Sequence, residues 1–512
     1  MFNLGIVERL MESFLKRLSS NLIESLDVHV AYIATNLSRQ SDRSYPCLDP
    51  FKNGISEATK LKATEKLARI FVVYIALLTS DFEEVVTSHQ VRKTSADKLD
   101  GHISKDEYRN WLTVFEETLM VASWIYSDRH CKIFFQGGRK SVANKRMIRF
   151  LSMYKKFAPR TQGMGLKIIK FHHLLHLWWV IRMFGSLLNV DSSRGESNNR
   201  ILAKQVGKST QQQHKTLNLQ TAVNMYKKNL ILTSLEQSIN SSSDGTQKCV
   251  TSEKKPNTAT GSKFQLVFDY DKETLSAHWT SFKLKGRRCN FSETILMSVY
   301  HKLKNYNGGI IGRQIKCISG CTEFIIDNEE CSIVRACPNY RQLHHWHDWI
   351  NVSWEDDNDE IELCAQLLII LDTSQIVFEE FESNNTEVEH DVIPHKIVAF
   401  VHSTSTQRPS KTMPVEGGNG YTSNLATWIQ MENEFHMIDA CSISGTCFVL
   451  IDKTIRNGEY TLVGSSERVI RLCPKSSWSS KFLDYSNTEL IRLSQSNFDN
   501  RIVDEDNIPF EY

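Results

Sequence analysis

The spacing of apolar positions changes once along the chain and separates two kinds of predicted structure. Up to about residue 235, apolar residues recur every three or four positions, which places them on one face of a helix. The ranges 57–79 and 105–126 show this period. At the N-terminus it is carried by Leu10, Phe14, Leu15, Leu18, Leu22 and Leu26. We therefore predict that residues 1–235 are all-helical, with the Trp- and Leu-rich segment 174–180 deeply buried.

Residues 236–262 interrupt this pattern. They are dominated by Ser, Thr, Asn, Lys and Gly and have no apolar period, which predicts a flexible linker. A helix is expected after the linker, at about 291–305. Asn290 is its predicted N-cap, and Glu293 is the third residue of a capping box.

In residues 263–486 the apolar period becomes two, as a half-buried strand requires. Ile350 and Val352, for example, alternate with Asn351. Many short strands joined by polar loops favour an antiparallel barrel or sandwich, followed by a poorly ordered tail at 487–512. The chain is thus predicted to be α+β. The predicted strands are Gln314–Ile326, Ser332–Ala336, Trp349–Glu355, Leu363–Leu371, Lys396–Ser403, His436–Ile443, Phe448–Asp452, Tyr460–Val463 and Arg468–Leu472.

Two segments of the β region resemble each other. Ile318–Asp327 and Ile443–Asp452 both begin with Ile-Ser-Gly and end with Ile-Asp, and each is followed by an Arg-x-Cys-Pro sequence, at Arg335–Pro338 and Arg471–Pro474. A duplicated strand–turn–strand unit would explain the likeness. Similar strand composition would also explain it, and the sequence leaves both open.

Charge is unevenly distributed, although the net charge of the 512 residues is only +2. Residues 155–228 hold thirteen Lys or Arg against two acids, Asp191 and Glu196. An excess of this size can displace counterions from a nucleic-acid backbone. A solvated basic helix face is the alternative, and composition alone does not decide between them.

Twelve scattered cysteines and the absence of a signal-peptide pattern predict an intracellular protein with free thiols. The longest apolar run, Ile70–Leu78, is too short to span a bilayer. We therefore expect no membrane association.

Three clusters have both a chemical and a packing interpretation. His172 and His176 would share a helix face, but a zinc site needs at least three protein ligands, so packing is favoured. The aromatic pair Trp346 and Trp349 flanks Asp348 and could form a recognition surface, although core packing is favoured. Four cysteines lack the tight pairs of a zinc site and are interpreted as small buried hydrophobes: Cys317, Cys321, Cys331 and Cys337.

One arrangement of residues resembles the C-terminal catalytic segment of DDE-type cut-and-paste transposases of the CACTA-like, Plavaka and Kyakuja–Dileera–Zisupton types. Their pattern is Lys-x-His-x-x-x-His, an apolar helix, a Gly, and an acidic residue opening a basic helix. The matching residues here are Lys170, His172, His176, Gly185, Glu196, Arg200 and Lys204.

The likeness extends to a transposon-derived family common in algal genomes. That family continues with a basic stretch and a Gln, matched by Lys204, Gly207, Lys208 and Gln220. It also carries a β module with Arg-x-x-Pro-Asn-Tyr and Trp-x-Asp-Trp motifs. These correspond here to Arg335–Tyr340 and to Trp346, Asp348 and Trp349.

The resemblance implies an RNase H-like core in which two Asp and one Glu hold divalent metal ions. Glu196 would be that Glu and a weak metal ligand. The helical region would resemble the insertion that precedes the Glu-bearing helix of an incomplete core. A nuclear location and DNA as partner are also implied. The residues expected to bind DNA phosphates are Arg194, Arg200, Lys204, Lys208 and Lys215.

The chain also departs from the pattern. Asn199 stands where the family often has His, and both catalytic Asp should lie on strands upstream. Asp27 is the only early Asp with β-like neighbours, and Mg²⁺ held by so few carboxylates would bind weakly. We therefore expect a truncated or remnant transposase that is not an enzyme alone. No cofactor is expected for this chain, and Mg²⁺ only where a complete site is assembled.

Two further hypotheses stand beside a DNA-binding remnant. The β region could contact a protein, chromatin or nucleic-acid partner while the helices serve as a scaffold. The sequence also allows a reading frame with no selected role. Neither the DNA sequence preference nor the oligomeric state can be predicted.

Overall fold

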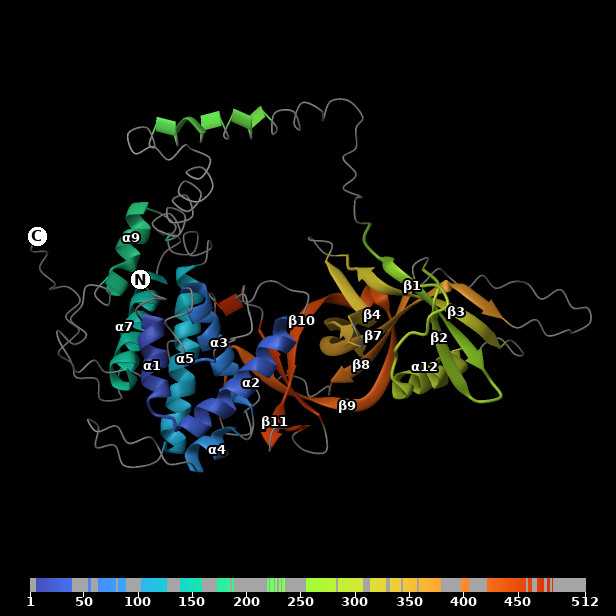
Figure 1. Cartoon of the computed structure of the whole chain (residues 1–512), viewed down its shortest axis with the longest axis horizontal. Coiled ribbons are helices and arrows are strands. Elements are labelled where there is room, and N and C mark those ends of the chain that lie inside the picture. The colour runs from blue at the N-terminus through green and yellow to red at the C-terminus, as the bar shows by residue number, and fades with distance from the viewer. Residues whose placement is uncertain are drawn as a thin grey trace, which may run out of the picture. The chain divides into compact units, whose positions relative to one another are not determined.

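The computed structural model describes most of the helical and β regions, with gaps (Figure 1). It describes residues 6–38, 54–56, 63–79, 82–88, 103–126, 139–158, 173–184, 187, parts of 219–234, 255–281, 284–306, 314–327, 332–341, 344–356, 359–378, 397–404, 421–456, 459–462, 467–473, 477, 478 and 481.

The chain divides into two compact units. The first consists of residues 1–124, 136–175 and 255–512, and the second of residues 125–135 and 176–254. The first unit is therefore discontinuous in sequence and contains most of the helical residues together with the β residues. The predicted limits of the helical region, linker, β region and tail stay predictions.

The described helices confirm the helical period of the N-terminal region. They are α1 (Glu8–Leu15), α2 (Ser20–Ser38), α3 (Ala63–Leu78), α4 (Phe82–Ser88), α5 (Lys105–Ile125), α7 (Arg139–Phe157) and, in the second unit, α9 (Leu177–Phe184). Among the helices in the described ranges, none has both the length and the apolar content needed to cross a membrane.

The first apolar series is divided between two helices. α1 ends at Leu15, and Leu18 is buried in the turn that follows. Ser19 then begins α2, because its hydroxyl accepts a hydrogen bond from the backbone N–H of Leu22 (3.3 Å) and its carbonyl from that of Ile23 (3.0 Å). A Ser at this position satisfies backbone donors that the first turn of a helix leaves free.

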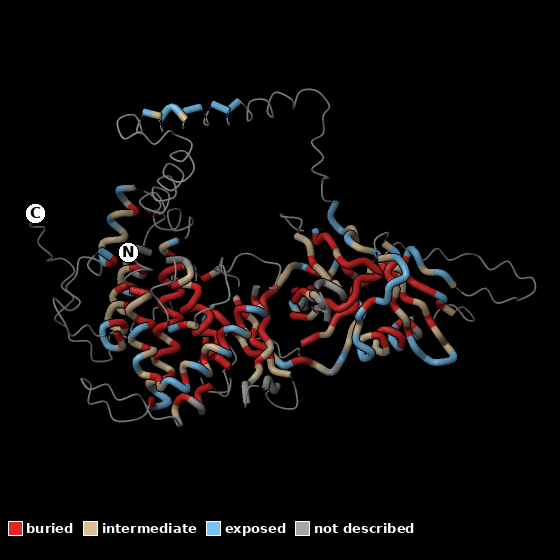
Figure 2. The backbone as a smooth tube through the Cα atoms, in the orientation of Figure 1, coloured by how far each residue is buried: buried red, intermediate tan, exposed pale blue. Residues whose placement is uncertain are grey.

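Aromatic side chains fill the space between α1 and α5. The ring of Phe14 meets the rings of Trp111 and Phe115 edge-on, with centroids 5.2 Å and 5.0 Å away. All three are buried, and buried segments (red in Figure 2) run through the helical region. The residues that the helical period places on one face thus form a core.

The described strands begin close to the end of the predicted linker. They are β1 (Thr258–Asp269), β2 (Thr274–Trp279), β3 (Ile315–Ile325), β4 (Ile333–Arg341), β5 (His344–His347), β6 (Trp349–Asp356), β7 (Asp359–Phe378), β8 (Ile397–Thr404), β9 (Ala426–Asp439), β10 (Ile443–Ile451), β11 (Lys453–Arg456), β12 (Glu459–Leu462) and β13 (Arg468–Leu472).

Eleven of the described strands form one antiparallel sheet, which confirms the α+β class. The order is β2-β1-β3-β7-β6-β10-β13-β9-β8, with β4 paired to β3 and β5 to β4. β8 also pairs with β7, through Leu371↔Val398 among others. The series of paired strands therefore closes on itself, running from β7 through β6, β10, β13, β9 and β8 back to β7.

β1 begins at Thr258, within the residues from which a linker is predicted. Its first residues are too polar for an apolar period, but they pair with β3, as in Thr258↔Ile325. Gly261, with φ of +83°, lies at the irregularity between Thr260 and Lys263. A Cβ there would lie 2.5 Å from the Thr322 hydroxyl, so the bulge requires glycine.

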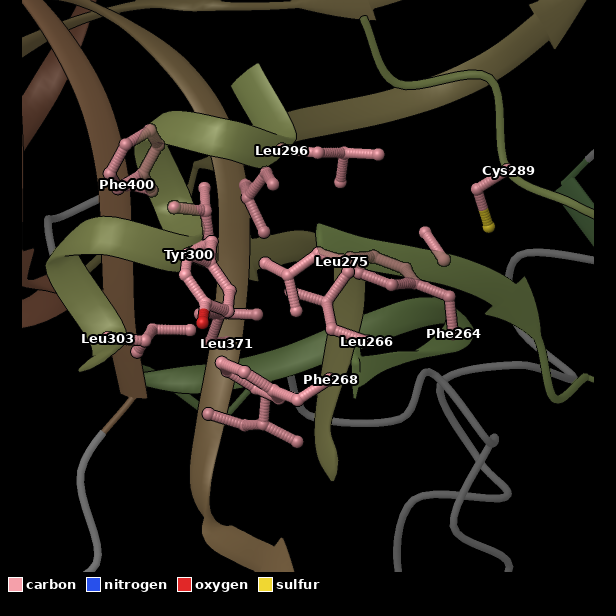
Figure 3. Close-up of a cluster of buried hydrophobic side chains, with 14 of the residues drawn as sticks. Phe264, Leu266, Phe268, Leu275, Cys289, Leu296, Tyr300, Leu303, Leu371 and Phe400 are labelled. Atoms are coloured by element: carbon pink, nitrogen blue, oxygen red, sulfur yellow. The ribbon is translucent and has the colours of Figure 1, made fainter. Parts of the chain in front are cut away.

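The predicted helix after the linker is confirmed as α12 (Glu293–Tyr306), but its predicted N-cap is wrong. Ser292, not Asn290, accepts the hydrogen bond from the backbone N–H of Ile295 (3.3 Å) through its hydroxyl. α12 buries Leu296, Tyr300 and Leu303 against β1, β2 and β7 (Figure 3). This packing orients the helix on the sheet.

The two similar segments of the β region both lie in antiparallel strand pairs. In the first, Glu323 of β3 pairs with Arg335 of β4. With the motifs aligned, the corresponding pair would be Phe448 and Arg471, but Phe448 of β10 pairs with Leu472 of β13. The pairings thus differ by one residue, and such a shift changes which side chains share a face. Duplication and similar composition both stay possible explanations.

Candidate functional site

Most residues for which the sequence predicts chemistry lie outside the described residues. These are Lys170, His172, Gly185, Arg194, Glu196, Arg200, Lys204, Lys208 and Lys215. Their predicted roles stay predictions. The described residues nevertheless include α7, which precedes these positions in the sequence, as well as His176 and the tryptophan motif at 346–349.

His176 lies in the turn before α9 and is half-buried. Its carbonyl accepts hydrogen bonds from the backbone N–H groups of Trp179 (2.9 Å) and Val180 (3.2 Å), so its backbone begins the helix. Within the described ranges, no group of three or more His, Cys, Asp or Glu is arranged to hold a metal ion.

The predicted deep burial of the segment at 174–180 is wrong for part of it. Leu174 is buried, but the Trp179 side chain is 43% exposed and that of Leu175 is 37% exposed. α9 has only eight residues, and a single short helix cannot bury aromatic residues on all its faces.

α7 carries a concentration of positive charge, and five of its basic residues precede the stretch counted from Lys155 onward. Its nineteen residues hold seven Lys or Arg and no acid. The Lys145, Lys155 and Lys156 side chains are exposed, and in the described part of the chain they form no ion pair. Lys145 and Lys156 lie on one face of the helix, since they are eleven residues, or about three turns, apart. We name Lys145, Lys155 and Lys156 the α7 basic face.

A buried ion pair fixes α7 against α5. The Arg146 guanidinium lies 2.8 Å from the Glu117 carboxylate of α5, and the side chains are 0% and 3% exposed. Arg149 lies 3.9 Å from the same carboxylate. Removing one member would leave an unpaired buried charge, which costs more than the pair contributes. α7 therefore presents Lys145, Lys155 and Lys156 outward.

Glu116, the neighbour of Glu117, is the centre of a second buried polar group, which we name the Glu116 cluster. Its carboxylate accepts hydrogen bonds from the hydroxyl groups of Tyr74, Tyr421 (3.2 Å) and Ser423 (2.8 Å). It also accepts from the side-chain amide (2.6 Å) and backbone N–H (3.2 Å) of Asn424. Five donors thus surround one carboxylate.

The cluster connects helices to the sheet. Glu116 belongs to α5 and Tyr74 to α3, whereas Ser423 precedes β9 and accepts hydrogen bonds from the backbone N–H groups of Leu425 and Ala426 (both 3.0 Å). Burial raises the pKa of Glu116, while hydrogen bonds from Tyr74, Asn424 and Ser423 act to lower it. Because Glu116 is only 3% exposed, the cluster is a structural connection rather than a reaction site.

The tryptophan motif forms a compact structural junction. The Asp348 carboxylate accepts hydrogen bonds from the backbone N–H of Arg335 (2.8 Å) and the indole N–H of Trp346 (2.5 Å). The backbone N–H of Leu367 donates to the Asp348 carbonyl (2.9 Å). Asp348 and Trp349 are buried at 2% and 6% exposure. The burial of Asp348 and Trp349 thus agrees with the packing interpretation of the tryptophan motif, whereas Trp346 is only half-buried.

The cysteines agree with the packing interpretation where they are described. Cys317 and Cys321 of β3 are buried free thiols, and Cys337 is a half-buried one. Cys331 lies outside the described residues.

Sequence reasoning missed the Glu116 cluster and the N-terminal half of α7. Glu116 and Glu117 interrupt an apolar stretch of α5, which is the one local signal of buried carboxylates. Their partners are up to 308 residues away, so the sequence could not identify them. Comparisons with protein-family models, curated proteins and solved structures give no match to this chain.

Proposed function

We propose that the chain is a non-catalytic, DNA-binding remnant of a transposase-like protein that uses the α7 basic face to contact phosphates. The observation that carries this proposal is the exposure of Lys145, Lys155 and Lys156 on a helix without acids. Most protein–DNA hydrogen bonds go to phosphate and sugar, and Lys is a common donor. In the described part of the chain these three lysines form no ion pair, and Lys156 contacts only the face of the Phe157 ring (5.2 Å), so their charges can replace counterions on DNA phosphates.

The charge continues into the following segment. From Arg139 to Lys228 the chain holds eighteen Lys or Arg against Asp191 and Glu196. An excess of this size supports binding to a polyanion rather than an ordinary solvated face, because mixed signs are typical of a neutral surface. The phosphate contacts expected of Arg200, Lys204 and Lys208 belong to the same proposal.

The proposed absence of catalysis rests on the position of Asp27. Asp27, the early Asp considered as a metal ligand, lies on α2 and not on a strand. Its carboxylate accepts a hydrogen bond from the backbone N–H of Ile55 (2.6 Å), and Gly54, at φ of +76°, packs against it. Asp27 therefore does not fit the strand-borne ligand of a divalent-metal site, which leaves Glu196 without a described partner carboxylate.

The test measures binding of the full chain to mixed-sequence double-stranded DNA over a range of salt concentrations. The triple variant Lys145→Glu, Lys155→Glu, Lys156→Glu should bind at least tenfold more weakly at low salt. The slope of log K against log salt should fall by about 2–3, since each lost phosphate contact removes about 0.9.

A matched control reverses the same number of charges on the β region. Lys285, Arg287 and Arg288 lie exposed between β2 and α12. Charge reversal at these three positions should leave the salt slope unchanged. Equal weakening in both triple variants would contradict the α7 proposal. Weaker DNA binding only in the control variant would favour the alternative, in which the β region contacts the partner.

The non-catalytic part has its own test. The purified chain with Mg²⁺ or Mn²⁺ should not cleave DNA strands carrying transposon ends or random sequence. Metal-dependent cleavage that Glu196→Ala abolishes would contradict the proposal and leave the binding result intact.

A further inference from the structure

Two thiols meet inside the β region, which we name the Cys364–Cys447 pair. The sulfur atoms of Cys364 on β7 and Cys447 on β10 are 3.1 Å apart. Both are free thiols, 3% and 7% exposed. They belong to a buried cluster with Trp349, Met431 and Val469. The distance is shorter than an ordinary van der Waals contact between large atoms.

The strand register explains why the two side chains converge. Cys364 pairs with Asn351 of β6, and Cys447 pairs with Trp349 of the same strand. Residues two apart on a strand point to the same face, so both thiols lie on one face of β6. β7 and β10 are not paired to each other in the described sheet. A bond between these sulfurs would therefore connect two strands that both pair with β6 but not with each other.

We propose that Cys364 and Cys447 form an intramolecular disulfide when the chain folds in the presence of a low-molecular-weight disulfide such as oxidised glutathione. One cysteine thiolate attacks the glutathione disulfide, which forms a mixed disulfide and releases one glutathione. The second cysteine then attacks the mixed disulfide, forms the Cys364–Cys447 bond and releases the second glutathione. The two cysteines lose two electrons, and their protons end on the two glutathione thiols.

The proposal places the reaction during folding or local opening, not in the closed sheet. Burial, together with the neighbouring Cys364, raises the pKa of the Cys447 thiol, and the thiolate is the reacting form. To reach a disulfide bond length the sulfurs must approach by about 1 Å, and the backbones of β7 and β10 must draw together, because they lie on either side of β6. The backbone at Cys364 is already held by a hydrogen bond from the Thr404 hydroxyl to its carbonyl (2.7 Å).

The experiment compares two treatments of the full chain. In one, the folded reduced protein is incubated with oxidised glutathione. In the other, the chain is denatured, reduced and refolded in a glutathione redox buffer. Peptide mapping should find a Cys364–Cys447 cross-linked peptide, two hydrogens lighter than the reduced pair, in the refolded sample and much less in the incubated one. The cross-linked form should have a higher melting temperature than the reduced form.

Controls separate this pair from random oxidation. Cys321→Ser removes another buried thiol and should leave the cross-linked peptide unchanged, whereas Cys364→Ser and Cys447→Ser should each abolish it. Circular dichroism confirms that each variant folds. If refolded, folded chain lacks the Cys364–Cys447 peptide, or if Cys364 is found joined to several other cysteines in comparable amounts, the proposal is wrong.

Discussion

Single buried polar residues set the response of the helical core to pH. The ring of His29 on α2 is 4% exposed, and its Nε2 lies 2.9 Å from the hydroxyl of Thr79. That hydroxyl donates to the Ala76 carbonyl (2.6 Å), so it accepts from His29, and the Nε2 atom must carry the proton. Burial lowers the pKa of His29 to about 4. The folded state therefore holds this ring neutral.

Acid should destabilise the protein through His29. The unfolded ring titrates near its ordinary pKa of 6.5 and the folded ring near 4. The unfolded state thus binds the proton first, and stability present above pH 6.5 is lost as the pH falls towards 4. The loss is about 3 kcal/mol. The difference in unfolding free energy between wild type and His29→Gln, measured by urea denaturation, should shrink by that amount between pH 7 and pH 4. Parallel pH profiles for the two proteins would contradict this assignment.

Glu116 should be among the most sensitive positions in the chain. Glu116→Ala leaves the donors of Tyr74, Ser423 and Asn424 without their acceptor in a buried site, which costs about 3 kcal/mol or more. Glu12→Ala is the control, because the Glu12 side chain is exposed and lies 3.6 Å from Arg9, and such surface pairs contribute about 0–1 kcal/mol. Urea unfolding of both variants measures the contrast. Similar losses in the two would show that the Glu116 cluster is not a structural connection.

At the scale of the element, the junction at Asp348 fixes how β4, β5 and β7 meet. Its side chain contacts one backbone and one indole donor, and its own backbone pairs with both β4 and β7. An isosteric replacement of Asp348 is the most informative probe, since it keeps the side-chain volume and changes only the hydrogen bonds.

Asp348→Asn should lower the unfolding free energy by about 2 kcal/mol, because the new amide group places a donor against one of two existing donors. The Trp346 indole should become more mobile, visible as a red shift of tryptophan fluorescence. Asp271→Asn, in the exposed turn between β1 and β2, should change the free energy by about 0.5 kcal/mol or less. An unchanged stability in Asp348→Asn would show that these hydrogen bonds are replaced by others.

Elements with a strong period were predictable from sequence, and elements decided by distant partners were not. α5 was expected at 105–126 and runs from Lys105 to Ile125. β13 was expected at 468–472 and has those limits. β1 was missed because its polar first half becomes a strand only by pairing with β3. β9 begins ten residues before its predicted start, since its polar positions pair with β13 and β8.

The sequence predicted the positive charge of the candidate site but not which of its basic side chains are exposed. Local composition identifies basic residues, and so the sequence indicated positive charge near Lys155. Which of these charges are exposed depends on the ion pair of Arg146 with Glu117 on another helix. No local pattern predicts a contact between residues 29 positions apart on separate helices.

At the scale of the whole molecule, the first unit is assembled from distant parts of the sequence. Besides the Glu116 cluster, Phe71 on α3 packs against Trp478, with ring centroids 5.3 Å apart. The indole N–H of Trp478 donates to the Cys473 carbonyl (3.0 Å). Residues 1–124, 136–175 and 255–512 therefore belong to one unit, although residues 176–254 separate its last part from the rest in the sequence.

Cutting the chain should not separate these parts. With a specific protease site inserted between Asn240 and Ser241, the two fragments should co-elute in size-exclusion chromatography after cleavage and unfold in one cooperative transition. The double variant Glu116→Ala, Ser423→Ala should weaken their association after the same cleavage. Separation of the wild-type fragments without denaturant would show that the helical and β residues fold independently.

The Glu116 cluster also imposes an order on biosynthesis. Asn424 follows Glu116 by 308 residues, and a ribosome adds about 5–20 residues per second. A newly made α5 therefore exists for about 15–60 seconds before the amide and hydroxyl donors for its carboxylate emerge. During that interval, the helical core can form only with Glu116 hydrated. Each ribosome thus carries an unfinished helical core with an exposed apolar surface, which is the state that chaperones bind.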